Sequence, residues 1–195
     1  MSRPQAGTVA AAVAAADART MDHETMQAFR RCAGSFPTGV CVVTAEREAG
    51  PAGMTLNSFT SISLDPLLVL VSLGHGARTL EAVRASGRFA VSVLHRGQSE
   101  IALDFAARGA AFPGEHVRRT EHGFLLVRHA LAHVVCNVHE VVPAGDHDLV
   151  LGEVVDFGAV SGEPLVFHAG RFGGVAADVA APAGFADFLD EGIGW

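Results

Sequence analysis

The sequence predicts a mainly β protein in which many strands form one closed or sandwiched core, accompanied by a few peripheral helices. Segments of strand length with alternating or continuous apolar residues occur along most of the chain. Two helical segments lie among them, too few for a doubly wound parallel sheet. The 195 residues, 49% of them hydrophobic, are enough for one main domain with a sizeable core.

The first residues are predicted to be a disordered leader, over 1–20, followed by a helix over 22–33. The stretch AGTVAAAVAAADA is weakly apolar for the core of a signal peptide and too short to span a bilayer as a helix. We therefore favour a leader on a cytoplasmic protein over a secretory signal. Asp22 is the candidate N-cap of the helix, and Gly34 lies just beyond its end. The main domain is predicted over 21–176.

Strands dominate the rest of the chain. They are predicted over 39–45, 52–64, 67–73, 88–94, 130–142, 147–158, 164–168 and 171–176. The run 67–73, LLVLVSL, is continuously apolar and is expected to be buried on both faces. Helices are predicted over 77–86 and 98–108, the second followed by a polar loop. Residues 177–195 contain four acids and no base, and are predicted to be an acidic tail or an arm that packs on a partner.

Charge and cysteine content disfavour several classes of function. A formal net charge of −7 without a cluster of Lys or Arg disfavours a nucleic-acid partner, and no segment after the leader is expected to cross a membrane. Cys32, Cys41 and Cys136 are widely spaced and form no CxxC pair, so we expect buried, reduced thiols. His129 and His133 fall on a predicted strand, where i, i+4 side chains do not converge as they do on a helix. No metal site is therefore predicted.

Polar side chains alternate along the predicted strand 52–64. One face carries Met54, Leu56, Ile62 and Leu64, and the other carries Thr55, Asn57, Phe59, Ser61 and Ser63. A solvent-exposed sheet face is one interpretation, since Thr and Ser are ordinary there. The second face contains no charged residue, however, and its hydroxyls and amide also suit a ligand that has a flat ring with a polar edge.

Two further segments carry candidate site residues. In SLGHGARTLEAV, the residues Ser72, His75, Arg78 and Thr79 lie where a strand gives way to a helix, and a helix N-terminus beside an arginine suits a phosphate. An ordinary turn with a solvated arginine is the alternative. In AGDHDLVLGEV, His147 lies between two aspartates in a turn, either as a functional histidine or as a solvated loop residue. Motifs of the type GxSxG, HExxH and strand-bound GxGxxG do not occur.

Five segments together resemble the flavin reductase family, which supplies reduced flavin to two-component monooxygenases. They are FPTGVCVVTA, GMTLNSFTSISLDPLLVLVSL, GRFAVSVL, GDHDLVLGEV and PLVFHAGRFGG, in order from about Phe29 to Gly174. The resemblance implies a split β-barrel of Greek-key character that binds FMN or FAD and forms a homodimer, with the flavin near the dimer interface.

The resemblance also implies roles for individual residues. The isoalloxazine ring and ribityl chain would lie along Thr55, Asn57, Ser58, Ser61, Ile62 and Ser63. The flavin phosphate would be held by Ser72, Arg78 and Thr79, and His75 in the same segment is a further candidate cofactor-binding residue. His147 matches the histidine of the family's GDH motif, on the nicotinamide side, and is the candidate catalytic residue, with Arg171 and Phe172 nearby. Ser92 stands where relatives usually have Asn, which puts one local hydrogen bond in question.

The implied activity is hydride transfer from NADH or NADPH to FMN or FAD, for a monooxygenase served by diffusible reduced flavin. NADH is preferred because no Arg/Lys pair is evident for a 2′-phosphate. The sequence leaves FMN and FAD as alternatives, and does not say whether the flavin is a prosthetic group or a substrate. Two other functions compete: a flavin-binding electron-carrier module without nicotinamide turnover, and an enzyme like pyridoxamine-phosphate oxidase, which the low Lys and Arg count disfavours.

Overall fold

The computed structural model describes residues 22–176, which fall in two units divided between Phe36 and Pro37. The predictions for 1–20 and 177–195 lie outside the described residues, and the predicted domain limits of 21–176 stay a prediction. In the first unit, helix α2 spans His23–Ala33. The side chain of Asp22 accepts a hydrogen bond from the Thr25 amide at 2.7 Å, which confirms the predicted N-cap. Cys32 on this helix is exposed, so its predicted burial is wrong.

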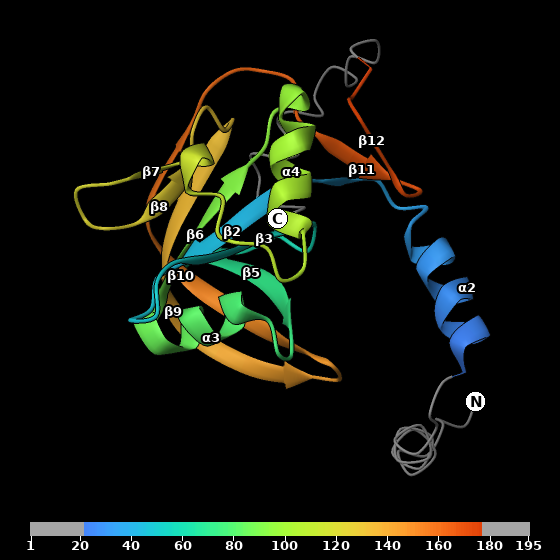
Figure 1. Ribbon diagram of the computed structural model, residues 1–195, viewed down its shortest axis with the longest axis horizontal. Helices are drawn as coiled ribbons and strands as arrows, with labels where there is room; N and C mark the ends of the chain where they lie inside the picture. Colours follow the sequence, from blue (N-terminus) through green and yellow to red (C-terminus); the bar gives the residue numbers. More distant parts are fainter. Residues whose placement is uncertain (1–21, 177–195) are drawn as a thin grey trace, which may run out of the picture. The chain divides into compact units, whose positions relative to one another are not determined.

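The second unit is built on a seven-stranded antiparallel sheet (Figure 1). Its strands, in spatial order, are β3 (Ala52–Leu56), β2 (Cys41–Ala45), β6 (Arg88–Val93), β9 (Ala132–Ala144), β10 (His147–Ala159), β5 (Leu67–Gly74) and β4 (Thr60–Leu64). Three pairs of neighbours, β2–β3, β4–β5 and β9–β10, are consecutive in the chain and form hairpins. The predicted mainly β class is confirmed.

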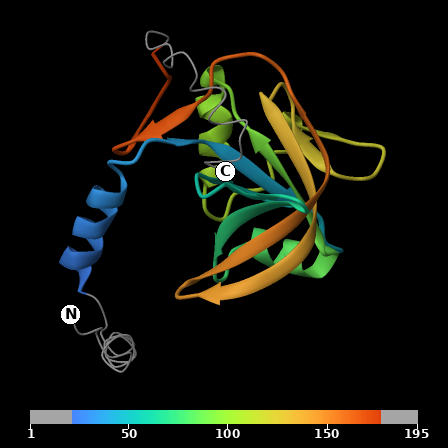
Figure 2. The same ribbon diagram turned by 180° about the vertical axis from the view of Figure 1, so that it is seen from behind.

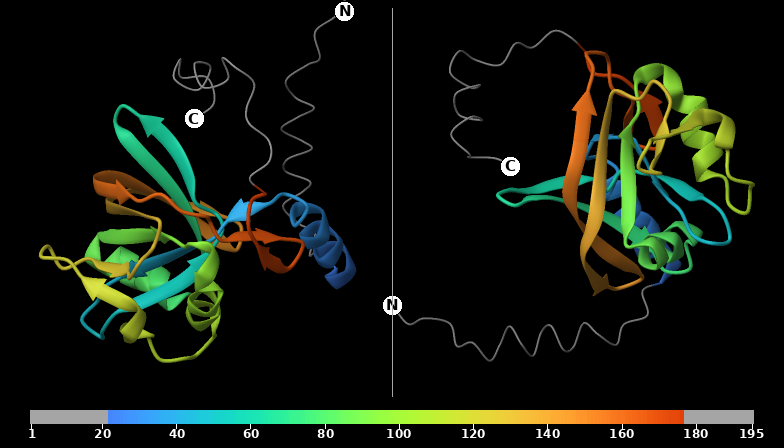
Figure 3. Two further views of the ribbon diagram at one scale, coloured as in Figure 1. Left: turned by 90° about the horizontal axis from the view of Figure 1, so that it is seen from above. Right: turned by 90° about the vertical axis from the view of Figure 1, so that its left-hand side faces the viewer.

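The sheet is strongly curled because its two edge strands are joined directly. Strands β3 and β4 lie at opposite edges, yet only residues 57–59 connect them, and this connection spans at most about 14 Å. Seven strands laid flat would separate the edges by about 29 Å. The edges must therefore approach each other, although no ladder joins β3 to β4. Figures 2 and 3 show the resulting barrel-like curl.

The single strand predicted over 52–64 is wrong, because the chain leaves the sheet at 57–59 and re-enters it at the other edge. The side chains of this connection bond to other parts of the fold: Asn57 donates to Thr38 and Ser58 bonds to Ser72. The predicted apolar face is also broken. Ile62 and Leu64 on β4 are 41% and 61% exposed, since β4 is an edge strand whose partner is β5 alone.

Helices α3 (Arg78–Ser86) and α4 (Ser99–Ala106) confirm the two predicted later helices. Gly87 ends α3 in the left-handed conformation, at φ 67°, which a residue without a Cβ adopts easily. Short 3-10 turns precede and follow α4, at Arg96–Gln98 and Gly114–His116. No helix in the described range 22–176 is long and apolar enough to cross a membrane.

Small strands complete the second unit. A three-stranded sheet contains β1 (Thr38–Gly39), β11 (Val166–His168) and β12 (Arg171–Gly173), and a hairpin contains β7 (Val117–Arg119) and β8 (Leu125–Val127). The hairpin was not among the predicted strands, since its strands are three residues long. It is anchored from the sheet: Ser92 Oγ accepts a hydrogen bond from the Val127 amide at 3.0 Å.

The core lies on both faces of the sheet near β2. Cys41 and Val43 pack in a cluster with α3, while Val42, on the opposite face, packs in a cluster with α4. Strand β5 contributes Val69, Val71 and Leu73 to the first cluster, but its alternate residues are partly exposed. The predicted burial of this strand on both faces is therefore wrong, because only one face packs on the core.

Candidate functional site

Antiparallel pairing of β5 with β10 brings two of the candidate segments together. His147 pairs with Gly74, and Asp148 pairs with Leu73, at the last rungs of the ladder. Just beyond the ladder, the His75 amide donates to the Asp146 carbonyl at 2.9 Å. The SLGHG turn and the GDH turn, some seventy residues apart in the sequence, thus form one corner of the fold.

His147 lies against the backbone of Gly74. A Cβ placed on Gly74 would be 3.4 Å from His147 Nε2, which is van der Waals contact, so the imidazole packs beside this position of β5. His147 Nδ1 is 2.7 Å from a carboxylate oxygen of Asp146, and the imidazole is about half exposed. This hydrogen bond lowers the pKa of Asp146 below its ordinary value, and the nearby charge of His147 adds to the effect.

The 57–59 connection is held on the same strand, β5. Ser58 Oγ accepts a hydrogen bond from the Ser72 amide at 3.0 Å and donates one to the Ser72 carbonyl at 3.2 Å. In the β4–β5 ladder Thr60 pairs with Leu70, so two residues further on Ser58 would pair with Ser72. At that position the Ser58 hydroxyl makes the hydrogen bonds to β5 in place of the Ser58 main chain. Ser72 and Gly74 share a face of β5, about 7 Å apart. The row of Ser58, Ser72 and His147 therefore runs diagonally across this end of β5, with Ser58 on the β4 side and His147 on the β10 side.

The other predicted ring-binding residues lie on the edge strands β3 and β4 or on the 57–59 connection. Thr55, on the edge strand β3, donates from its hydroxyl to the Ala102 carbonyl of α4 at 2.7 Å. Asn57 donates to the Thr38 hydroxyl at 3.0 Å. Ser61, Ile62 and Ser63 lie on β4, where the Ser63 hydroxyl accepts from the Asp65 amide at 3.2 Å. Thr55 therefore faces α4, while Asn57 ties the connection to β1.

Of the predicted phosphate-binding residues, Arg78 and Thr79 lie at the start of α3 and Ser72 lies on β5, while the further candidate His75 lies in the turn between them. The N-cap residue, Ala77, supplies no side-chain cap, so the first amides of the helix keep their positive partial charge available to an anion. Arg78 is exposed and donates to the Ala110 carbonyl at 2.7 Å, which leaves further guanidinium donors. Thr79, in contrast, is 2% exposed and packs with the core.

Arg171 and Phe172 are not beside His147 within this chain. Both lie on β12, in the sheet of β1, β11 and β12, which does not include β5 or β10. The Phe172 ring packs edge-on against Phe167, with 5.6 Å between ring centroids. The structure thus joins three predicted segments near the end of β5 and separates this fourth one from them.

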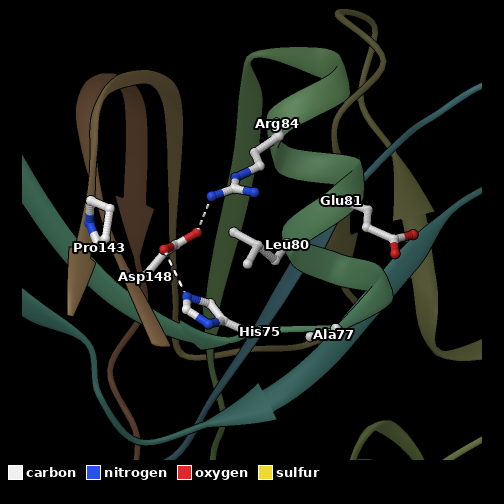
Figure 4. A pocket seen from close by; sticks show the side chains of 8 residues that line it. His75, Ala77, Leu80, Glu81, Arg84, Pro143 and Asp148 are labelled. Atoms are coloured by element: carbon white, nitrogen blue, oxygen red, sulfur yellow. Dashed lines mark hydrogen bonds and ion pairs between the residues drawn. The ribbon is translucent and has the colours of Figure 1, made fainter. Parts of the chain in front are cut away.

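A buried carboxylate that sequence reasoning did not single out lies behind His147. Asp148 is 1% exposed and bonds to His75 Nε2 at 3.1 Å and to the Arg84 guanidinium on α3 (Figure 4). A cavity of about 410 Å³ opens beside these groups, with Leu80 and Pro143 also in its lining. The alternation of β10 could have predicted the burial of Asp148, because Asp148 lies on the same inward face as Val150.

The sequence of the chain matches the model of the flavin reductase like domain over residues 33–176. The chain belongs to the flavin reductase family. One relative, the NADH-dependent FMN reductase SmoA of Agrobacterium fabrum, is 38% identical over 150 residues, covering 77% of this chain and 86% of its own. The reductase subunit HsaB of a flavin-dependent monooxygenase from Mycobacterium tuberculosis is 34% identical, covering 83% of this chain and 89% of its own.

A solved flavin reductase has the same fold. The NADH:FAD oxidoreductase SgcE6 of Streptomyces globisporus, in complex with NAD and FAD fragments, aligns with a TM-score of 0.76 and 38% identity, over 84% of this chain and 100% of its own. The predicted fold of a flavin reductase is thereby confirmed, although its seven-stranded sheet is not closed into a barrel by a ladder between β3 and β4.

The donor set of the site fits a flavin. Neutral hydroxyls and an amide suit the polar edge of the ring, and Arg78 with the uncapped N-terminus of α3 suits a phosphate. Within residues 22–176 no group of three or more His, Cys, Asp or Glu side chains is arranged to hold a metal ion.

Proposed function

We propose that this flavin reductase family member is an NADH-dependent flavin reductase, which uses FMN or FAD. The observation that carries the proposal is the row of Ser58, Ser72 and His147 along the end of β5, because it joins the residues matched to the flavin with the residue matched to the nicotinamide. The relatives named FMN reductase (NADH) and NADH:FAD oxidoreductase support NADH as the reductant and support both flavins.

Holding the flavin is the task of two groups of residues. Ser61, Ser63 and Asn57 offer hydroxyl and amide groups to the ring and ribityl chain, while Arg78 and the N-terminus of α3 offer positive charge to the phosphate. The bound flavin supplies the redox chemistry, by accepting a hydride from the reduced nicotinamide. The protein therefore binds and orients two rings, which explains why the site needs no nucleophile or pair of carboxylates.

His147 is proposed to contact the nicotinamide side. Its Nδ1 faces Asp146, so an Nδ1–H donated to that carboxylate leaves Nε2 directed toward Gly74 and the face that carries Ser72. We expect His147→Ala to raise KM for NADH about tenfold, with a smaller effect on flavin affinity. His122→Ala is the control, since His122 is also exposed but lies in the β7–β8 loop. Unchanged nicotinamide kinetics in His147→Ala would remove this residue from the site.

One assay tests the activity itself. The oxidation of NADH and of NADPH by the purified protein is followed with added FMN, added FAD and no added flavin. Turnover that needs added flavin supports a reductase that uses diffusible flavin and identifies both substrates. If flavin copurifies and no combination shows turnover, the electron-carrier alternative is the better description and the reductase proposal is wrong.

A monooxygenase that consumes the reduced flavin is the proposed recipient. The name of the HsaB relative, a reductase subunit of a flavin-dependent monooxygenase, supports this assignment. Free reduced flavin can reach the recipient by diffusion, so no stable complex is required. We further propose that the protein acts in the cytoplasm, where NADH is available, which cell fractionation tests.

A homodimer is proposed because the edge strand β4 and its hairpin expose apolar side chains. Ile62, Leu64 and Leu67 are 41%, 61% and 39% exposed, and a second copy of the chain would cover them. We expect light scattering to give the mass of a dimer, and Leu64→Asp to shift it toward the monomer. Leu103→Asp is the matched control, because Leu103 on α4 is equally exposed, at 59%. A monomeric wild-type protein would contradict the proposal.

A further inference from the structure

Asp148 is a charged side chain in the core, and its two partners come from elements that frame the site. Its carboxylate is 1% exposed, whereas His75 and Arg84, which bond to it, are about half exposed. His75 belongs to the turn between β5 and α3, and Arg84 to α3 itself. The Asp148 cluster, which consists of these three residues, therefore joins β10 to both the turn and the helix (Figure 4).

The cluster lies directly behind His147. Successive side chains of a strand point to opposite faces, so Asp148 points toward α3 while His147 points toward the face of Ser72 and Gly74. The ladder between β5 and β10 ends at His147, and beyond it the His75 amide bond to Asp146 is the next link. A strand end followed by an exposed turn frays easily unless side chains hold it.

We propose that Asp148 is a positioning residue that acts through His147. By binding His75 and Arg84, the carboxylate fixes the GDH turn against the β5–α3 turn and so keeps the His147 imidazole over Gly74. In this proposal Asp148 does not contact the nicotinamide, because its carboxylate is bonded to His75 and Arg84 on the face of the strand opposite His147. This inference rests on the proposed function, in which His147 contacts the nicotinamide.

Kinetics in two backgrounds test the proposal. In the wild-type background we expect Asp148→Asn, which keeps the shape of the side chain, to lower kcat/KM for NADH about tenfold through misplacement of His147. In the His147→Ala background the same substitution should change kcat/KM less than twofold, since its target is gone. Glu163→Gln is the control: Glu163 pairs with Arg96 at 2.9 Å on the exposed surface, and its loss should change neither background.

A second measurement tests how firmly the GDH turn is held, independently of enzyme activity. Hydrogen exchange of the His75 amide, which bonds to Asp146, should become at least tenfold faster in Asp148→Asn and stay unchanged in Glu163→Gln. If Asp148→Asn does not fold, Arg84→Gln weakens the cluster from its exposed side and takes its place, with Arg96→Gln as control.

The outcomes separate this proposal from the proposed function. Wild-type protein without NADH oxidation would overturn the reductase function, while faster His75 exchange in the variant would still report a role for Asp148 in holding the turn. With an active wild type, an equal loss of kcat/KM in both backgrounds would make Asp148 a structural residue and overturn its action through His147. Unchanged His75 exchange together with unchanged kinetics would overturn the positioning role altogether.

Discussion

The hydroxyl of Ser58 is predicted to stabilise the curled sheet by fastening the 57–59 connection to β5. Ser58→Ala removes both of its hydrogen bonds to Ser72, at 3.0 and 3.2 Å. A neutral hydrogen bond contributes about 0.5–1.5 kcal/mol to stability. Because Ser58 is half-buried and water can replace part of the loss, we expect the free energy of unfolding to fall by about 1–2 kcal/mol.

Urea unfolding followed by circular dichroism measures this change. In a chain of this length, the expected loss corresponds to a decrease in Tm of about 2–8 °C. The matched control is Ser35→Ala: Ser35 Oγ donates a single long bond to the Arg31 carbonyl at 3.4 Å in an exposed position. We expect the control to change the free energy of unfolding by less than about 0.5 kcal/mol.

The comparison of the two serine variants tests whether the Ser58 hydroxyl holds the 57–59 connection on β5. If Ser58→Ala loses no more stability than Ser35→Ala, the hydroxyl does not hold the connection and the sheet curls without it. A loss above about 3 kcal/mol would also contradict the reasoning, because two neutral hydrogen bonds do not account for it.

Two further predictions concern ionisable groups. Burial raises the pKa of Cys41 and of Cys136 to about 12, whereas Cys32 is exposed. A thiol reagent at pH 8 should therefore modify Cys32 rapidly in the native protein and all three thiols after unfolding. Rapid modification of all three thiols in the native protein would contradict this prediction. The pKa of Asp146 is lowered by its hydrogen bond to His147. The contribution of this pair to the stability of the fold is therefore present above about pH 4 and is lost as the pH falls through the lowered pKa of Asp146. NMR titration should find this pKa closer to its ordinary value in His147→Ala, and an unchanged pKa would refute the pairing.

Most helices and strands could be predicted from local pattern because local chemistry specifies them. The N-cap at Asp22 and the left-handed Gly87 are set by residues within one turn of each helix end. The strands β9 and β10 are long and mostly alternate, and their ranges differ from the predicted ones by a residue or two. The short strands β7 and β8 were missed because three residues carry too little periodicity.

The break at 57–59 could not be found from alternation. A period of two continues formally through the connection, so the pattern gives no sign that the chain changes edges. At the break Asn57 bonds to Thr38 and Ser58 bonds to Ser72, and neither partner is a sequence neighbour. Alternation places Ile62 and Leu64 on the same apolar face as Met54 and Leu56. Their exposure on β4 was not predictable from it, since edge position is a property of the whole sheet.

The sequence by itself determined the mainly β class, the segments that carry the site and, through motif resemblance, the flavin reductase family. Composition, local periodicity and short motifs are all read within a few residues, so these properties needed no coordinates. The tertiary structure alone decided that Ser58, Ser72 and His147 share one row, that Thr79 is enclosed, and that Asp148 is a buried ion partner behind the histidine. These facts depend on the register of β5 against β10 and on the curl of the sheet, which join residues far apart in the chain.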